Sequence, residues 1–397
     1  MHMAQQFFTG LPLFVVLFWL LLFILEYKNS DLAKRFLVVF LAVASLNYLA
    51  HWFYFNHNYT AYNILDSVWV FTSLAAYPIY YYYIRLLTID TKINLKWIWI
   101  LFPAILLSLF SAILYLLMSP EEITLFTKEI LYHTQSNESE YSTLINLQTL
   151  RRNLVRIVFA SEVVLVLYFG LNLISSFNEK VRSFYSNIEN KELSKIRYIL
   201  YFLVIASIIS ILSNFIGKNY FTDHSYLLVI PSIAHSVALF GMSYVGYKQN
   251  FTIHDLKIEK QNYTSEDSDE SERSEEIFTT NQLDRLYLRL ESLFDDKEIF
   301  KDPDLRLNEV ARLLGTNRTY VSKLINTRRN VSFNDFVNEY RVRYSEKILT
   351  SSDYFSHSLE EIALESGFSS TSSFYRSFVK KNGIPPGRYR EKKGRIS

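Results

Sequence analysis

Long, nearly uninterrupted runs of apolar residues dominate the first 250 positions of the chain. Each run is near or above the ~20 residues that an α-helix needs to cross the hydrocarbon core of a bilayer. So many stretches of this length exceed what the core of a water-soluble protein needs. The pattern therefore predicts an all-α fold that begins with a seven-helix transmembrane bundle. The expected spans are residues 7–26, 35–54, 61–87, 97–118, 154–177, 195–216 and 226–247.

Positive charges in the short connections predict the orientation of this bundle. Lys and Arg are concentrated in the connections 27–34, 86–96 and 178–194, and the alternate connections have fewer of them or balance them with acidic residues. Connections rich in Lys and Arg stay on the cytoplasmic side of a membrane. With an odd number of spans, the N-terminus then lies outside and everything after residue 247 lies in the cytoplasm.

A few ionisable or strongly polar residues interrupt the spans, and this orientation places them in the outer half of the membrane. Charges in lipid are costly and usually face a bundle interior or a water-filled cavity. These residues are candidates for a ligand pocket open to the outside, and interhelical hydrogen bonding is the alternative role. A neighbouring carboxylate would tend to keep either histidine of the set protonated. The candidates are Asn47, His51, Asp66, Glu162 and His235.

The sequence offers no signature of catalysis or of metal binding. It contains no cysteine, which excludes disulfides, thiolate zinc sites and cysteine nucleophiles. It also lacks the H-E-x-x-H, G-x-S-x-G and P-loop motifs. We therefore expect no catalytic residue, no metal and no cofactor, and a protein that is not an enzyme.

The chain changes character after the last apolar run. From residue 255 to 276 there are nine Asp and Glu against three Lys and Arg, a net charge of −6. Low hydrophobicity and like-charge repulsion predict disorder from residue 264 on. The expected domains are the membrane domain 1–247, a flexible acidic and serine-rich linker 248–276, and a C-terminal domain 277–397.

The C-terminal domain has helical periodicity and contains an internal repeat. The segments LNEVARLLG (307–315) and LEEIALESG (359–367) align, and each has an alanine four residues before its glycine. A small residue and a turn glycine at this spacing suit two short helices that cross closely, as in a helix-turn-helix motif. The expected motifs cover about 307–326 and about 359–382, and a long connecting helix covers 332–351.

The charge of this domain favours a nucleic-acid partner. From residue 305 to 397 there are 17 Lys and Arg against 9 Asp and Glu, a net charge of +8. Phosphate contacts dominate affinity for DNA and require such an excess. The alternative is a generic helical domain with a solvated basic face, and the repeated motif counts against it.

The stretch from about 281 to 390 resembles the AraC/XylS-type DNA-binding domain, a seven-helix unit with two helix-turn-helix motifs. The most specific part is IALESGFSS followed by GIPPGRYR (383–390). The resemblance implies that both recognition helices enter the major groove on one face of DNA, and that Arg341 is structural. The implied base-edge contacts are Arg318, Thr319, Tyr320, Ser322, Lys323, Thr371, Ser372, Ser373, Tyr375 and Arg376. The implied phosphate contacts are Lys380, Lys381, Arg388 and Arg390.

Two positions depart from the pattern of this family. Arg306 stands where a capping Thr or Ser is frequent, and Ser345 stands where a small apolar residue is usual. We expect the first to weaken one helix start and neither to prevent folding. The membrane half does not resemble the soluble sugar-binding barrel that is the familiar sensor of the family.

Together these features predict a membrane-bound one-component transcription regulator in a bacterial inner membrane, controlled by a signal sensed in its transmembrane domain. Two alternatives stay open: a transporter or membrane enzyme with a fused regulatory domain, and a passive anchor for a DNA-binding regulator. The implied partners are promoter or operator DNA, the lipid bilayer, a small-molecule or membrane signal, a second copy in a homodimer, and RNA polymerase if the protein is an activator.

Overall fold

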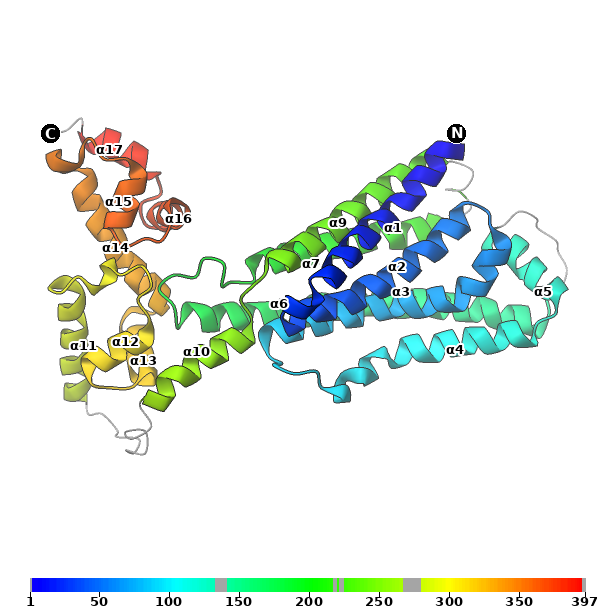
Figure 1. Ribbon diagram of the computed structural model, residues 1–397, viewed down its shortest axis with the longest axis horizontal. Helices are drawn as coiled ribbons and strands as arrows, with labels where there is room; N and C mark the ends of the chain where they lie inside the picture. The colour runs from blue at the N-terminus through cyan, green and yellow to red at the C-terminus, as the bar shows by residue number, and fades with distance from the viewer. Residues whose placement is uncertain (1, 133–140, 217–219, 221–224, 267–279, 395–397) are drawn as a thin grey trace. The chain divides into compact units, whose positions relative to one another are not determined.

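The computed structural model describes residues 2–132, 141–216, 220, 225–266 and 280–394. All regular secondary structure in these residues is helical, as the sequence predicts. The chain divides into two compact units (Figure 1). The first unit comprises residues 1–175 and 193–254, and the second comprises residues 176–192 and 255–397.

Long helices build the first unit, and they lie where the seven spans were predicted. They are α1 (His2–Leu25), α2 (Leu32–Phe55), α3 (Tyr59–Thr88), α4 (Phe102–Leu117), α6 (Thr143–Arg182), α7 (Ser194–Ile216) and α9 (Val229–Lys248). Shorter helical segments join some of them: Tyr27–Asn29, Leu95–Leu101, α5 (Pro120–Leu125), Phe126–Leu131 and Ser225–Leu228.

Side-chain caps set the starts of several of these helices. The Asp31 carboxylate accepts a hydrogen bond from the Lys34 backbone N–H at 2.8 Å, at the start of α2. The Asn58 side chain accepts from Ala61 N–H at 3.1 Å, at the start of α3. Such caps satisfy backbone donors that have no partner within the helix. The polar breaks between apolar runs therefore end one helix and begin the next.

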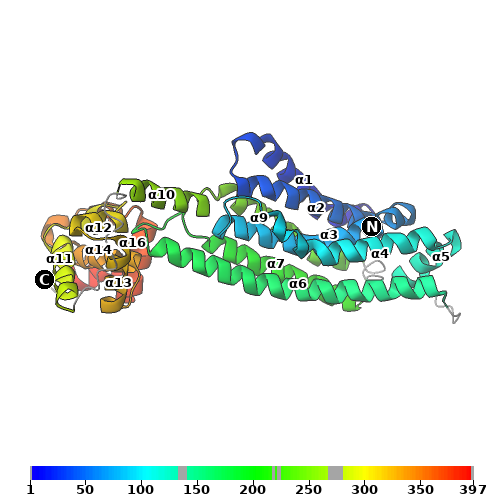
Figure 2. The same ribbon diagram turned by 90° about the horizontal axis from the view of Figure 1, so that it is seen from below.

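The long helices lie side by side in a bundle (Figure 2). Helix α2 packs between α1 and α3, α3 also packs on α4, and α9 packs on both α1 and α7. Gly170 lets α6 approach its neighbours closely, because a Cβ there would lie 3.0 Å from Leu200 of α7 and 3.2 Å from Ile84 of α3. Glycine at this position therefore leaves room for side chains of α3 and α7 beside α6.

Six of the described helices are long and apolar enough to cross a membrane. Their outward surface is apolar, for example Phe14 with 63 % of its surface exposed and Leu116 with 85 % exposed. Water-soluble proteins rarely expose so much contiguous apolar surface. The composition of these helices is therefore compatible with a lipid environment.

Helix α3, the remaining predicted span, falls outside this set although it is 30 residues long. At 1.5 Å per residue it is about 45 Å long, more than the ~30 Å hydrocarbon core. Its hydropathy is lowered by residues that face the interior, including Asp66, Thr72, Tyr80 and Tyr83, which are all buried. Because α3 lies between α2 and α4, its polar residues are shielded by protein.

The second unit contains shorter helices around α14. They are α10 (Ile253–Glu266), α11 (Thr280–Asp295), α12 (Leu307–Leu314), α13 (Arg318–Arg329), α14 (Phe333–Leu349), α15 (Leu359–Glu365), α16 (Thr371–Asn382) and α17 (Pro386–Gly394). Helix α14 corresponds to the connecting helix predicted at 332–351. It contributes to two apolar cores, Phe336 to one with α11–α13 and Val342 to the other with α15–α17.

The structure differs from the sequence prediction in the acidic segment. Helix α10 occupies Ile253–Glu266, in the middle of the stretch 248–276 that was expected to be a flexible linker. From Asp255 on, this helix belongs to the second unit. Residues 267–279, on which the prediction of disorder mainly falls, lie outside the described residues.

Candidate functional site

The first helix pair is formed by α12 and α13. Gly315 ends α12 with a left-handed φ of +65°, a conformation that L-residues other than glycine rarely adopt. The Asn317 side chain then accepts from the Tyr320 backbone N–H at 3.1 Å and starts α13. At the start of α12, where Arg306 replaces a capping residue, Glu309 accepts from the Arg306 N–H at 2.9 Å. The predicted helix-turn-helix geometry is present.

The second pair, α15 and α16, repeats this arrangement with a longer turn. Ser358 and Glu361 form the predicted capping box at the start of α15. Gly367 has a φ of +83°, and a Cβ at this position would lie 2.5 Å from the backbone oxygen of Phe300. Glycine is therefore required here both by conformation and by space. The Ser370 hydroxyl caps α16 by accepting from the Ser373 N–H at 3.2 Å.

The recognition helices bury one face and expose the other. Val321 and Ile325 of α13, and Phe374 and Phe378 of α16, are buried in the two cores. Of the base-edge candidates, Thr319, Lys323, Ser372, Tyr375 and Arg376 are exposed. The other candidates are half-buried: Arg318, Tyr320, Ser322, Thr371 and Ser373.

The phosphate candidates differ in their present partners. Lys380 Nζ lies 2.6 Å from Asp335 Oδ1 and Lys381 Nζ lies 3.1 Å from Glu346 Oε1, both acids being on α14. Such exposed ion pairs contribute little and exchange readily for other anions. Arg388 is exposed, whereas Arg390 donates to the backbone oxygen of His357 at 2.9 Å. Arg390 is thus partly engaged in holding the second motif together.

Arg341 is a buried side chain that ties segments of this unit together. Its guanidinium donates to the backbone oxygens of Phe300 at 2.8 Å and Asp302 at 2.7 Å. Burial lowers the pKa of Arg341 to about 10, which still leaves it charged at neutral pH. This arrangement fits the structural role that the resemblance implies. Ser345, the other departure, is fully buried and donates to the Val342 oxygen at 2.7 Å.

The α6–α7 loop (residues 183–192) belongs to the same compact unit as the two motifs. Ser186 N–H donates to the Leu305 oxygen at 3.2 Å, and Leu307 N–H donates to the Phe184 oxygen at 3.1 Å. Arg341 Nη2 donates to the Ser186 hydroxyl at 3.2 Å. The loop is therefore hydrogen bonded along the backbone that leads into α12. Sequence patterns gave no sign of this contact.

Two acidic side chains extend this loop contact to α10 and to α16. Glu259 of α10 accepts from the Tyr185 hydroxyl at 2.6 Å, and its carboxylate lies 3.5 Å from Arg306. Glu189 of the loop accepts a hydrogen bond from the Ser370 hydroxyl. Because Ser370 is the N-cap of α16, a carboxylate lies at the start of the second recognition helix. Anions are favoured at helix N-termini, where DNA phosphates also bind.

The first unit encloses a cavity of about 560 Å³. It is lined by side chains from α1, α2, α3, α6, α7 and α9. Four of the five sequence-predicted pocket residues line it: Asn47, His51, Asp66 and His235. Ligand cavities of this size are common for small molecules.

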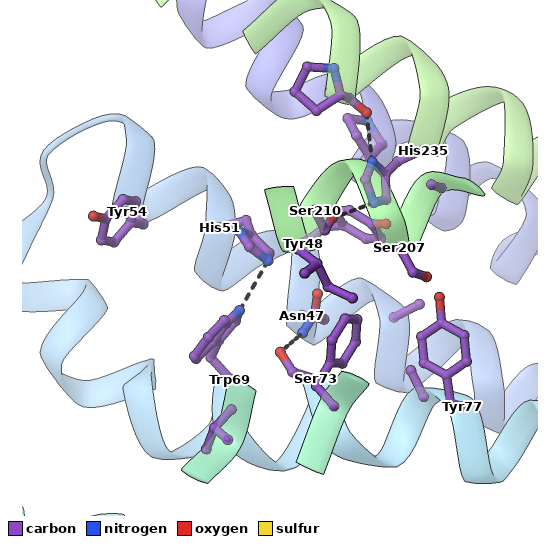
Figure 3. Close-up of a pocket in the computed structure, with 18 of the residues that line it drawn as sticks. Asn47, Tyr48, His51, Tyr54, Trp69, Ser73, Tyr77, Ser207, Ser210 and His235 are labelled. Atoms are coloured by element: carbon purple, nitrogen blue, oxygen red, sulfur yellow. Dashed lines mark hydrogen bonds between the residues drawn. The ribbon is translucent and has the colours of Figure 1, made fainter. Parts of the chain in front are cut away.

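Polar side chains point toward one another across this cavity (Figure 3). Trp69 Nε1 of α3 donates to His51 Nε2 at 3.0 Å, and Asn47 Nδ2 donates to the Ser73 hydroxyl at 2.7 Å. In this hydrogen bond the Trp69 indole N–H is the donor and His51 Nε2 is the acceptor. The expectation that a neighbouring carboxylate keeps either histidine protonated stays a prediction.

His235 joins α9 to α7. Its Nδ1 lies 2.7 Å from the Pro231 backbone oxygen and its Nε2 lies 3.0 Å from the Ser210 hydroxyl (Figure 3). Because a carbonyl oxygen only accepts, Nδ1 carries a proton and donates it. Because the His235 imidazole contacts Pro231 of α9 and Ser210 of α7, it links the positions of these two helices.

Asp66 forms a buried ion pair that sequence reasoning missed. Its carboxylate lies 2.8 Å from Arg151 of α6, and both side chains are 1 % exposed. The hydroxyls of Tyr62 and Tyr115 donate to the same carboxylate at 2.9 and 3.0 Å. Arg151 was expected in an external connection because it precedes the apolar run. The long α6 carries it into the bundle instead.

Glu162 lies apart from the other pocket candidates. It is buried on α6, it does not line the cavity, and neither of its carboxylate oxygens has a hydrogen-bond partner among the described residues. The similar depth of Asp66, Glu162 and His235 in their spans predicted convergence. Depth along a helix does not fix which way a side chain points, and Glu162 is on a different face.

The C-terminal part of the chain is similar to known helix-turn-helix proteins. A family model for a helix-turn-helix domain matches residues 310–392. An HTH-type transcriptional regulator of Bacillus subtilis, YtdP, is 33 % identical over 92 residues, which cover 23 % of this chain and 12 % of that protein. An HTH-type transcriptional regulator of Staphylococcus aureus strain COL is 30 % identical over 102 residues, covering 26 % of this chain and 13 % of that one. The chain thus spans about an eighth of these relatives.

Two solved structures also match this part. One is a protein from Listeria innocua, 28 % identical, with a TM-score of 0.24, covering 27 % of this chain and 95 % of that one. The other is the C-terminal domain of AraT, a response regulator from Geobacillus stearothermophilus. It is 24 % identical, has a TM-score of 0.24, and the match covers 28 % of this chain and 84 % of that one. The family model and these relatives thus support an AraC-type helix-turn-helix domain in the C-terminal part of this chain.

Proposed function

We propose that this protein is a membrane-bound transcription regulator that binds specific DNA and responds to a ligand in the cavity of its helix bundle. The observation that carries the proposal is the pair of capped helix-turn-helix motifs in a chain whose other half consists of long apolar helices. A transporter or an enzyme does not need two adjacent recognition helices. In this proposal the protein is not an enzyme.

The proposed topology has the N-terminus outside and the DNA-binding unit in the cytoplasm. The α6–α7 loop lies within the predicted cytoplasmic connection 178–194 and belongs to the same compact unit as the helix-turn-helix motifs. After this loop the chain continues through α7 and α9 of the first unit to α10, which belongs to the second unit from Asp255 on. This supports a cytoplasmic location for both the loop and the motifs.

In the proposed mechanism, a ligand changes the relative positions of the cavity helices. A ligand shifts a conformational equilibrium only if it binds one state better than the other. The cavity residues His235 and Ser210 lie on α9 and α7, and α7 follows directly after the α6–α7 loop. Movement of α7 would therefore change the position of Glu189 at the start of α16. A homodimer and RNA polymerase are the further partners expected for such a regulator.

DNA binding by the full chain, reconstituted in lipid nanodiscs, tests the proposal. Genomic fragments are first selected for binding, and affinity for a selected site is then measured against salt concentration. Lys323→Ala and Arg376→Ala remove exposed donors of the two recognition helices. We expect each to cost about 1–3 kcal/mol for the selected site and to reduce discrimination against mismatched sites.

Lys381→Ala removes a candidate phosphate contact, so it should weaken all sequences alike and reduce the salt slope. The matched control is Arg343→Ala on α14, an exposed arginine outside the recognition helices that pairs with Asp295. We expect near-normal binding from this control. If the full chain shows no salt-sensitive duplex binding, the assignment is wrong.

A further inference from the structure

One wall of the cavity carries an excess of positive charge. Helix α6 supplies Arg151, Arg152 and Arg156 to the lining. Residues 152 and 156 are four apart and therefore lie on one face of the helix. Asp66 is the one carboxylate among the described residues that line the cavity, and Arg151 already pairs with it.

The other two arginines have no acidic partner in the described part of the chain. Among the residues that the structure describes, neither Arg152 nor Arg156 has a carboxylate within ion-pair distance. Arg152 Nη1 donates to the Ile130 backbone oxygen at 2.6 Å, whereas its Nε is buried without a hydrogen-bond partner. Leaving a buried donor of a charged group unsatisfied is costly. An anion bound at this wall would accept a hydrogen bond from Arg152 Nε and balance the positive charge.

Most of the remaining lining is apolar or aromatic. The polar groups among it, such as Asn47 and Ser210, are already hydrogen bonded to neighbouring side chains. An apolar ligand body is the natural occupant of such a space, because ligand sites combine apolar walls with a few placed polar groups. The apolar lining includes Phe40, Phe55, Phe159, Leu203, Ile211 and Leu239.

We infer that the cavity binds an anionic amphiphile, with a carboxylate or phosphate head at Arg152 and Arg156 and an apolar body between the aromatic side chains. Guanidinium groups bind both kinds of oxyanion through paired hydrogen bonds. A cationic ligand would add a positive charge beside Arg152 and Arg156, and a neutral one could accept a hydrogen bond but would leave their charges unbalanced. This inference rests on the proposed function of the cavity as a ligand site.

The test uses the full chain in phosphatidylcholine nanodiscs with three probes of equal chain length. These are laurate, dodecanol and dodecylamine, which carry a negative, a neutral and a positive head. Trp69 lines the cavity, so tryptophan fluorescence reports binding, and the shift in melting temperature gives an independent measure. We expect laurate to bind at least about tenfold more tightly than dodecanol, and dodecylamine to bind least.

Paired variants test the role of the arginines. The double variant Arg152→Gln, Arg156→Gln should lose about tenfold or more of the laurate affinity and keep its dodecanol affinity. The double variant Arg152→Lys, Arg156→Lys keeps both charges and should retain the preference for laurate. Arg182→Gln, at the other end of α6, is the matched control and should bind laurate normally. Unchanged laurate affinity in the Gln variant, or equal binding of laurate and dodecanol, overturns the inference.

Changing the lipid of the nanodiscs shows whether the bound anion is a free ligand or a lipid head group. If phosphatidylglycerol nanodiscs alone stabilise the protein, and the Gln variant loses this stabilisation, the anion is a lipid head group and the chemistry stands. DNA affinity is measured in the same samples. Arginine-dependent laurate binding without any effect on DNA affinity would sustain the anion site and contradict its proposed signalling role. No arginine-dependent anion binding, in a protein that still binds DNA specifically, would contradict the anion site alone.

Discussion

At the scale of single residues, Asp66 and Glu162 are two buried carboxyl groups of one bundle that differ in their partners. Asp66 accepts from Arg151, Tyr62 and Tyr115, so its charge is neutralised and its oxygens are satisfied. Glu162 is buried without a hydrogen-bond partner among the described residues. Removing one member of a buried ion pair leaves the other uncompensated, which is strongly destabilising. The two acids should therefore differ sharply in their response to mutation.

Asp66→Asn is expected to lower stability by roughly 3–5 kcal/mol, because Arg151 would remain buried without its carboxylate. Glu162→Gln makes the same change of carboxyl to amide where no partner is lost, so it should change stability much less. The measurement is the melting temperature of the detergent-solubilised full chain, with membrane abundance recorded in parallel. Equal losses in the two variants would show that the Asp66–Arg151 pair has no special structural role.

At the scale of elements, the α6–α7 loop places the Glu189 carboxylate at the start of α16. A DNA phosphate approaching this helix N-terminus would meet a negative charge that already occupies the favourable position. We therefore expect Glu189→Gln to raise DNA affinity by about two- to tenfold, in line with the loss of a competing contact of about 0.5–1.5 kcal/mol. Affinity is measured by fluorescence anisotropy with the full chain.

The matched control for this prediction lies three residues further along the same loop. Glu192 accepts a hydrogen bond from Arg182, so Glu192→Gln should leave DNA affinity close to normal. An equal rise in both variants would indicate a general electrostatic effect of the loop. Weaker binding by Glu189→Gln would mean that the contact supports the recognition helix and does not compete with DNA.

At the scale of the whole molecule, the proposed orientation places α5 outside and the connection between α3 and α4 in the cytoplasm. The absence of native cysteine makes single introduced cysteines unambiguous reporters. Glu121→Cys and Lys92→Cys are both at exposed positions, one on each connection. A membrane-impermeant maleimide should label Glu121→Cys on intact cells and Lys92→Cys only after permeabilisation. The reverse pattern would invert the orientation and place the cavity wall on the opposite side.

The sequence alone predicted the elements of this fold because helix formation depends on local features. Apolar runs of sufficient length marked each bundle helix, and the alanine and glycine spacing marked both helix-turn-helix motifs. The capping box of Ser358 and Glu361 and the left-handed Gly315 and Gly367 follow from the conformational preferences of these residue types. Four of the five pocket candidates line the cavity, because polar residues within apolar helices face inward.

The tertiary structure decided which of these elements meet. Arg151 pairs with Asp66, Glu162 stays out of the cavity, and Arg152 and Arg156 enter its lining, because helix rotation within a bundle is set by packing against neighbours. The sequence places these side chains at known depths and leaves their direction open. Likewise, the α6–α7 loop hydrogen bonds to backbone more than 100 residues away. Backbone groups carry no sequence signature, so only the folded chain reveals that this loop belongs with the DNA-binding unit.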